Sequence, residues 1–363
     1  MIKLKSQQAK PDRWLFFLTL FLVIFGLLMV FDASFVMAVQ TFSDKFHYFR
    51  LQCLWAFLGL VFLIFASLVN YHFWKKISFP LFLFSLILLI LVLIPGIGLK
   101  IWGGRRWLGI GEFYFQPSEL AKTTFVIYLA SMFEKKRNFG QFLFLVGLVG
   151  LLVILEPDLG TSLILIFSAF VVFFVSGARL KEIFSFAFLS LIAIMIFIFT
   201  SSYRLSRFKA FLNPKNDSLN TSYHLRQVIL ALGSGGWLGR GIGQSRQKYL
   251  FLPDAASDSI FAVIGEEFGF LGATGLIIVF WLILARGIKI SLEAEDRFGE
   301  ILAAGLTSII FIQSFLNLGS MVSLVPLTGV PLPLISYGGS SLLITLFNIG
   351  ILLNISKYKT KLK

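Results

Sequence analysis

Charged side chains are scarce in this chain. They account for 14% of its 363 residues, whereas soluble domains carry about 25%. Hydrophobic residues reach 57%, and the chain contains 43 phenylalanines. A water-soluble globule has no interior large enough for so much apolar surface, and a disordered chain does not contain it. The composition therefore excludes both of these classes.

Cysteine and histidine are also scarce. Cys53 is the one cysteine and lies inside an apolar run, which excludes an internal disulfide and a cysteine metal site. The three histidines, His47, His72 and His224, are far apart in the sequence, and no HExxH or similar spacing occurs. The sequence therefore reveals no metal site and no cofactor, although it leaves room for a divalent cation such as Mg²⁺ or Mn²⁺.

Long apolar runs dominate what is present. A helix needs about 20 apolar residues to cross a bilayer, and ten segments approach or reach that length. We therefore expect an all-α polytopic membrane protein, with residues 1–363 forming a single domain of ten transmembrane helices. A long loop, residues 201–258, separates the seventh and eighth spans. The expected spans are 14–39, 51–69, 77–98, 118–133, 139–155, 160–176, 183–200, 259–285, 301–323 and 339–356.

Lys and Arg are distributed unevenly between the two sets of loops. With a cytoplasmic N-terminus, the inner segments carry 18 of these residues and the short outer loops carry five. The long loop is left out of this comparison because long loops cross the membrane largely regardless of charge. The asymmetry predicts that both termini are cytoplasmic and that 201–258 is outside. The net charge of +14 then reflects loops that contact membrane lipids, and no nucleic-acid partner is expected.

The first outer segment with unusual chemistry contains Arg105 and Arg106 in a glycine-rich stretch, followed by Glu119 and Lys122 at the start of the fourth span. Outer arginines run against the positive-inside trend, and their planar forks suit phosphate oxygens. Ionisable side chains inside a membrane are functional by default. These residues are therefore candidates for binding an anionic substrate. The alternative is a structural Glu119–Lys122 pair, with the arginines on lipid headgroups.

Two aspartates precede predicted spans on the outer side. Asp158 lies in the tight turn 156–162, where it caps a helix, binds a cation or accepts protons. Asp258 ends the long loop, with Glu266 and Glu267 two turns further along the next span. A helix N-terminus favours the ionised carboxylate, so we expect Asp258 to be a charged acceptor. The alternative is a simple N-cap.

Glycine and proline are concentrated in two further outer segments. Residues 233–243 include seven Gly or Ser but lack the P-loop pattern GxxxxGK[ST]. We interpret them as a flexible or re-entrant loop over a membrane-level cavity, with basic side chains for an anionic ligand. Residues 326–341 contain three prolines, and Ser336 and Ser340 near their end are placed to hydrogen-bond a sugar or to start the last span.

Together these segments resemble the SEDS family, the FtsW/RodA type of cell-wall proteins. The chain departs from the family around Asp258. Where the family reads Leu-Pro-Glu-Ala-His-Thr-Asp-Phe, this chain has Ala256 in place of the histidine and Ser259 in place of the phenylalanine. Two other stretches, 243–248 and 262–267, look more like the FtsW division branch than the RodA elongation branch. The matching stretches, in the family's order, are 104–122, 157–161, 223–243, 252–269 and 317–341.

The resemblance implies a peptidoglycan glycosyltransferase that polymerises lipid II on the outer face of the cytoplasmic membrane. It also implies a class B penicillin-binding transpeptidase and other division proteins as partners. Two alternatives stay open. One is a flippase for lipid II, and the other is a non-catalytic division scaffold. The polar path of a flippase would consist of Glu119, Lys122, Glu266 and Glu267.

The resemblance also assigns roles to the candidate residues. Asp258 would be the general base that deprotonates the acceptor sugar. Cations near the pyrophosphate would stabilise the charge that grows on the leaving group. The carboxylates would orient those cations or help to hold a divalent ion. The candidates for binding the pyrophosphate and the sugar are Arg105, Arg106, Lys122, Glu119, Asp158, Ser336 and Ser340.

Overall fold

The computed structural model describes residues 9–101, 104–111, 113–135, 137–212, 221–249 and 251–360. The basic N-terminal residues Lys3 and Lys5 lie outside these ranges. So does Gly103, which belongs to the first glycine-rich stretch.

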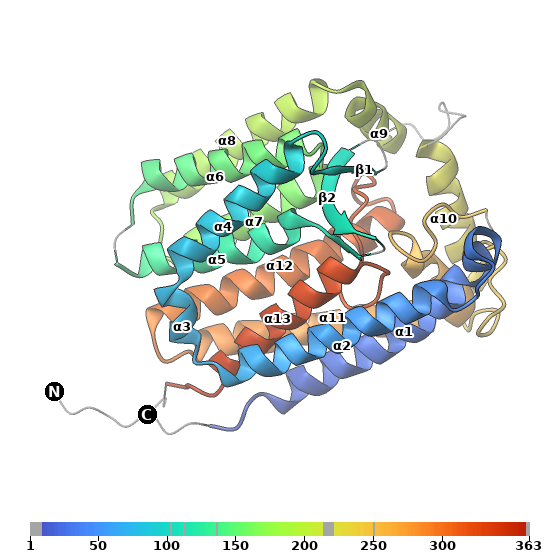
Figure 1. The fold of residues 1–363 in the computed structure, drawn as a ribbon, viewed down its shortest axis with the longest axis horizontal. Helices are drawn as coiled ribbons and strands as arrows, with labels where there is room; N and C mark the ends of the chain where they lie inside the picture. Colours follow the sequence, from blue (N-terminus) through green and yellow to red (C-terminus); the bar gives the residue numbers. More distant parts are fainter. Residues whose placement is uncertain are drawn as a thin grey trace.

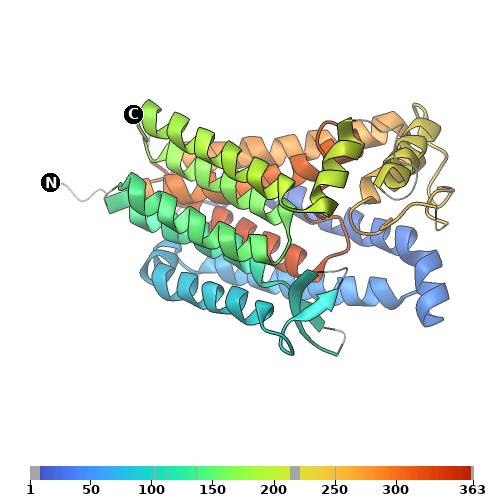
Figure 2. The same ribbon diagram turned by 90° about the horizontal axis from the view of Figure 1, so that it is seen from above.

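Ten long helices of the described chain run side by side along one axis of the molecule (Figures 1 and 2). Five are long and apolar enough to cross a membrane, and four are shorter apolar helices. The tenth, α5, has 19 residues and carries Glu119 and Lys122 in its first turns. Each helix overlaps one expected span, so the predicted polytopic α-helical frame is confirmed. The ten are α1 (Arg13–Phe42), α2 (His47–Leu68), α4 (Ser78–Leu93), α5 (Pro117–Lys135), α6 (Phe139–Leu155), α7 (Leu159–Val175), α8 (Leu180–Phe199), α11 (Ile260–Leu292), α12 (Arg297–Met321) and α13 (Gly339–Ile355).

Short elements gather at one end of the bundle (Figure 1). The strands β1 (Leu99–Ile101), β2 (Gly104–Ile110) and β3 (Phe113–Phe115) form an antiparallel sheet in the order β1-β2-β3. The helices α9 (Ser202–Leu212) and α10 (Thr221–Gly235) lie at the same end. We call it the sheet end. The sequence argument did not anticipate the sheet.

The helices α12 and α13 form the centre of the bundle. Along its length α13 packs against α2, whereas α12 packs against α7 and α11. Glycines allow close approach: a Cβ on Gly305 would lie 2.5 Å from Val126 Cγ1, and one on Gly350 would lie 2.4 Å from the carbonyl oxygen of Leu63. Lipid tails are as apolar as leucine, so such close packing is a main source of helix association in a membrane.

The two ends of the chain meet at the opposite end of the bundle, which we call the terminal end. The main-chain nitrogen of Asp12 donates to Ser356 Oγ at 3.0 Å, just before α1 begins and just after α13 ends. The Asp12 carboxylate also accepts a hydrogen bond from Arg286 Nε at 2.9 Å. The short helix α3 (Tyr71–Lys76) lies here as well, where His72 Nε2 is 2.9 Å from Asp296 Oδ2. The first and last helices of the frame therefore have their outer chain ends together at the terminal end.

Candidate active site

A small pocket opens at the sheet end, where distant parts of the chain converge. Its walls come from α9, α10, the turn before α11, the end of α12 and the connection between α12 and α13. The pocket contains Asp258, the residue that the sequence placed at the centre of the chemistry. Its polar lining consists of Arg207, His224, Asp254, Asp258, Asn317 and Ser320.

Asp258 lies immediately before the N-terminus of α11. The N-cap is Ser259, without a side-chain cap bond, so the interpretation of Asp258 as an N-cap is wrong. Asn317 Nδ2 donates to the main-chain oxygen of Asp258 at 2.8 Å and so fixes the backbone. Among the described residues, none forms a hydrogen bond or ion pair with the Asp258 carboxylate. The carboxylate is therefore available to a substrate.

The Asp258 carboxyl group titrates near neutral pH. Burial, together with the neighbouring Asp254, raises its pKa to about 7, against the opposing effect of the Arg207 guanidinium. Asp258 is therefore the expected charged acceptor only above this pKa, because burial outweighs the effect of the helix end. A pKa near the working pH allows a group to accept a proton and then to release it.

Arg207 and Asp258 lie on either side of Gly329. A Cβ built on Gly329 would be 3.3 Å from Asp258 Oδ2 and 3.7 Å from Arg207 Nη1. Gly329 also has a φ of +72°, a conformation that side chains with a Cβ rarely adopt. Arg207 Nη1 is held by a hydrogen bond to the Leu327 carbonyl oxygen at 3.1 Å. The pocket thus brings a cation and a carboxylate close to Gly329, where a side chain would crowd the Asp258 carboxylate.

His224 enters the pocket from α10. Its Nε2 lies 2.6 Å from Ser259 Oγ. Burial, with a smaller effect of Arg207, lowers the pKa of His224 to about 4, so the ring is neutral at neutral pH. The sequence argument did not include His224 or Arg207 among the candidates. Their position in a 58-residue loop gave no indication that they lie beside Asp258, and the one available signal was that both are ionisable.

Two amides on α12 hold residues 322–338, the proline-rich connection between α12 and α13, in place. Asn317 Nδ2 donates to the Val330 carbonyl oxygen at 2.8 Å, and Gln313 Nε2 donates to that of Pro331 at 3.1 Å. The two residues are four positions apart and so lie on one face of the helix. Polar side chains within an apolar span were the signal that would have identified them.

Arg106 is bound to the turn between α6 and α7. Its Nε donates to the Glu156 carbonyl oxygen at 2.8 Å, and its Nη2 donates to that of Pro157 at 2.6 Å. Successive residues of a strand face opposite sides, so Arg105 points away from these partners. The structure therefore does not bring the two arginines together on one face of β2.

Glu119 and Lys122 form a buried ion pair inside the bundle. Lys122 Nζ lies 2.9 Å from Glu119 Oε1 and donates to Gln313 Oε1 at 2.8 Å. Lys122 is 1% exposed. These contacts match the structural alternative, in which the pair joins α5 to α12. A role for either residue in substrate binding stays a prediction.

The turn between α6 and α7 contains two different carboxyl groups. Asp158 caps α7, because its Oδ1 accepts from Thr161 N at 2.9 Å and its Oδ2 accepts from Thr161 Oγ1 at 2.8 Å. Glu156 is 0% exposed, and neither of its carboxyl oxygens has a hydrogen-bond partner within the described part of the chain. Burial, with the nearby Asp158, raises the pKa of Glu156 to about 9. Glu156 is therefore neutral at pH 7.

Ser336 and Ser340 use their hydroxyl groups within the protein. Ser336 Oγ accepts from Leu332 N at 2.8 Å, and Ser340 Oγ accepts from Gln116 N at 3.0 Å. Ser340 also donates to the carbonyl oxygen of Tyr114 at 3.3 Å. Both hydroxyls are buried and join the proline-rich connection and α13 to their neighbours. Binding of a sugar by either serine stays a prediction.

The glycine-rich segment is fixed rather than flexible. Glu266 Oε2 accepts from Ser245 Oγ at 2.6 Å, and Glu267 Oε1 accepts from Lys248 Nζ at 2.9 Å. The backbone approaches α11 so closely that a Cβ on Gly239 would lie 2.1 Å from the Glu267 carbonyl oxygen. Of the predicted flexible or re-entrant loop 233–243, residues 233–235 belong to α10, and the rest is bound to buried carboxylates of α11. Glu266 and Glu267 thus form a cluster separate from the Glu119–Lys122 pair, and no contact in the described chain joins the two into a polar path.

A metal site is not assembled by the described residues. They contain no group of three or more His, Cys, Asp or Glu side chains that could hold a metal ion. In the α6–α7 turn, Asp158 is a helix cap and Glu156 is a neutral acid. A divalent cation therefore stays a prediction from the sequence, without support from the donor groups of the described chain.

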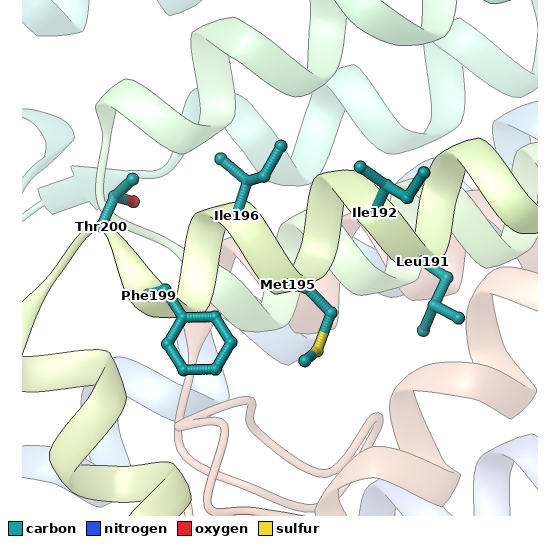
Figure 3. A pocket seen from close by; sticks show the side chains of 6 residues that line it. All are labelled: Leu191, Ile192, Met195, Ile196, Phe199 and Thr200. Atoms are coloured by element: carbon teal, nitrogen blue, oxygen red, sulfur yellow. The ribbon is translucent and has the colours of Figure 1, made fainter.

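An apolar hollow lies along α8, next to the sheet end. It is lined by residues between Leu191 and Thr200. Figure 3 shows Leu191, Met195 and Phe199 on one side of the helix and Ile192, Ile196 and Thr200 on the other. The next helix, α9, carries Arg207. The apolar hollow thus lies at the end of α8 that precedes α9.

Both the sequence and the structure of this chain are similar to those of known proteins. A family model of cell cycle proteins of the FtsW, RodA and SpoVE type matches residues 13–361. Stage V sporulation protein E of Bacillus subtilis (strain 168) is 40% identical over 97% of this chain and 99% of that protein. A probable peptidoglycan glycosyltransferase FtsW of Geobacter sp. (strain M18) is 37% identical over 95% of this chain and 96% of its own length.

Solved structures share the fold over nearly the whole chain. A chain of a peptidoglycan synthase complex that coordinates polymerization and crosslinking matches with a TM-score of 0.79 and 28% identity, over 97% of this chain and 99% of that one. The rod shape determining protein RodA of Thermus thermophilus matches with a TM-score of 0.72 and 28% identity, over 96% and 98% respectively.

Proposed function

The chain belongs to the family of FtsW, RodA and SpoVE cell cycle proteins, and we propose that it is a peptidoglycan glycosyltransferase that polymerises lipid II during cell division. The observation that carries this proposal is the Asp258 carboxylate. It lies in the pocket at the sheet end, has no partner among the described residues and has a pKa of about 7. These are the properties of a general base that works at neutral pH.

The proposed reaction joins the sugars of two lipid II molecules. Lipid II is a disaccharide-pentapeptide on an undecaprenyl pyrophosphate. Asp258 accepts the proton of the acceptor hydroxyl, whose oxygen forms a bond to the anomeric carbon of the donor. The bond from that carbon to the pyrophosphate oxygen breaks, and its electron pair leaves with the pyrophosphate.

Positive charge near Asp258 suits a pyrophosphate leaving group. Arg207 lies across Gly329 from Asp258, and Arg106 lies at the α6–α7 turn, close enough to lower the pKa of Asp258. We assign the leaving group to these two arginines. Arg105 and Lys122 stay candidates from the sequence, because neither is among the charges with the largest effects on the pKa of Asp258. The apolar hollow on α8 offers a surface for the polyprenyl chain.

The proposed site faces the outer side of the cytoplasmic membrane. The termini lie together at the terminal end, opposite the pocket. The excess of Lys and Arg in the loops of the terminal end favours a cytoplasmic position for that end. The sheet end would then meet lipid II after its translocation.

The proposed partner is a class B penicillin-binding transpeptidase. A similar chain belongs to a peptidoglycan synthase complex that coordinates polymerization with crosslinking. A transpeptidase would crosslink the glycan strands that this chain produces.

The purified protein in detergent tests the proposal. A polymerase makes glycan chains from lipid II without any membrane sidedness, and a transpeptidase partner can be added or omitted. A flippase needs two compartments and makes no polymer. If the detergent-solubilised protein forms no glycan chains with or without the transpeptidase, the polymerase function is ruled out.

A further inference from the structure

His224 lies in the pocket with Asp258 but takes no part in the proton transfer proposed above. The sequence places no imidazole beside Asp258, because Ala256 and Ser259 stand where the family pattern has histidine and phenylalanine. The fold supplies an imidazole from α10 instead, and His224 Nε2 contacts Ser259 Oγ at 2.6 Å.

Hydrogen bonds around Ser259 determine which ring nitrogen of His224 carries the proton. The Ser259 hydroxyl donates its one proton to the Pro253 carbonyl oxygen at 3.0 Å. His224 Nε2 must therefore donate to Ser259 Oγ. A neutral ring that donates through Nε2 keeps its lone pair on Nδ1, which makes Nδ1 a hydrogen-bond acceptor.

The neutral state of His224 suits its neighbours. Burial lowers its pKa to about 4, and Arg207 acts in the same direction. A protonated ring would add a second positive charge beside Arg207. It would also favour the ionised form of Asp258 and so weaken that carboxylate as a base.

We propose that His224 is a substrate-positioning residue, whose Nδ1 accepts a hydrogen bond from a sugar hydroxyl or amide N–H of lipid II while Ser259 fixes the ring. This inference rests on the proposed polymerase function. An uncharged acceptor holds the sugar without competing for the proton that Asp258 takes. Asp254 and Asp258, the carboxylates of the pocket, cannot fill this role without such competition.

Two conservative substitutions separate the two ring nitrogens. The side-chain oxygen of asparagine reaches the position of Nδ1, whereas the side-chain nitrogen of glutamine reaches that of Nε2. We expect His224→Asn to keep the KM for lipid II within about twofold. We expect His224→Gln to raise this KM about three- to tenfold, which corresponds to the loss of one uncharged hydrogen bond. The kcat changes less than KM in both variants.

A purely structural role predicts the reverse order. In that case His224→Gln keeps the bond to Ser259 and the wild-type KM, and His224→Asn lowers the melting temperature. That result overturns the proposal, as does an unchanged KM in both variants. Gln227→Leu, on the same helix but outside the pocket lining, is the matched control and should leave KM unchanged.

Melting temperatures are measured first, so that KM is compared between folded proteins. If one His224 variant does not fold, Ser259→Ala replaces it. This variant releases the ring and should raise KM about threefold, and a wild-type KM contradicts the proposal. Asp258→Asn in the same assay separates the two hypotheses. If the wild type polymerises lipid II, Asp258→Asn is inactive and KM is unchanged in the His224 variants, only the role of His224 is overturned. A wild-type protein that forms no glycan chains overturns the proposed function.

Discussion

The N-terminal part of α11 holds two acidic sites that differ in their partners. Glu267 accepts hydrogen bonds from Lys248 Nζ at 2.9 Å and from the main-chain nitrogens of Gly243 and Ser245, both at 3.1 Å. The carboxylate of Asp258, one position before the N-cap of the same helix, accepts none from the described residues. The satisfied carboxylate fixes a loop, whereas the unsatisfied one can exchange a proton with a ligand.

The difference shows that burial alone does not identify a reactive carboxylate. Glu119 and Glu267 are both buried, and each is paired with a lysine. Asp258 is only partly buried, yet it combines a missing partner with a pocket. A missing partner alone is not sufficient either, because Glu156 also lacks one but lies outside the pocket lining. The informative property is thus the combination of a missing partner with a pocket.

Asp258→Asn should have the largest effect on activity. Asparagine keeps the size of the side chain but cannot accept the proton. A positioned base contributes about 10²–10⁴ in rate, so polymerisation of lipid II should fall at least a hundredfold. The melting temperature should stay near that of the wild type, because Asp258 is not the helix cap. A stable variant with near wild-type polymerisation would move the base to another group.

Glu267→Gln should show the opposite behaviour. The amide removes a negatively charged partner of Lys248 and places a donor against one of the two main-chain N–H groups, because Gly243 and Ser245 donate to different oxygens of Glu267. Breaking a buried pair on one side costs about 3–5 kcal/mol, so the melting temperature should fall clearly. The rate per folded molecule should change much less than in Asp258→Asn. If the rate falls a hundredfold at an unchanged melting temperature, the contrast between the two sites fails.

Gly329→Ala should reduce activity without removing a functional group. The new Cβ lies 3.3 Å from Asp258 Oδ2, and the residue must keep a φ of +72°. Displacement of a catalytic group by about 1 Å costs on the order of a hundredfold, so we expect a loss of ten- to a hundredfold in kcat/KM. Gly111→Ala has a similar φ but open space around its Cβ, and it serves as the control. Equal losses in the two variants would indicate backbone strain instead.

Glu156→Gln should have the smallest effect on activity, because it changes only the stability of the protein and the pH dependence of that stability. The pKa of Glu156 is raised from 4.5 to about 9 by burial, so between these values the folded protein holds a proton that the unfolded chain has released. The stability of the wild type therefore falls as pH rises from 4.5 to 9. Glutamine removes this dependence and should raise the melting temperature at pH 8 by about 2–4 °C for each kcal/mol recovered, with little change at pH 5. Parallel melting curves at both pH values would show that Glu156 is ionised in the folded protein.

Most of the ten long helices were predictable from hydropathy, because a helix that crosses a lipid bilayer must be long and apolar. The errors occurred where hydropathy carries no signal. The predicted span 77–98 extends beyond α4, which ends at Leu93, because Ile94 and Ile97 continue the apolar run after the helix stops. The predicted span 301–323 starts late, because α12 begins with a charged first turn at Arg297, capped by Asp296.

The site was less predictable than the fold. Asp258 was found through its motif, but its pKa depends on burial and on Arg207, which is 51 positions away in the sequence. His224 and Asn317 approach Asp258 only through the packing of α10 and α12. The small sheet was missed because three short strands, two of them with three residues each, have no periodic pattern long enough to detect.

The pH dependence of kcat/KM for lipid II polymerisation tests the role of Asp258 most directly. The base is active when deprotonated and has a pKa of about 7. The account therefore predicts a rise of about tenfold per pH unit below 7 and a level rate above it. In Arg207→Met the midpoint should move to higher pH, because the guanidinium lowers the pKa of Asp258. A flat profile from pH 5 to pH 8 would contradict the assignment of Asp258 as the base.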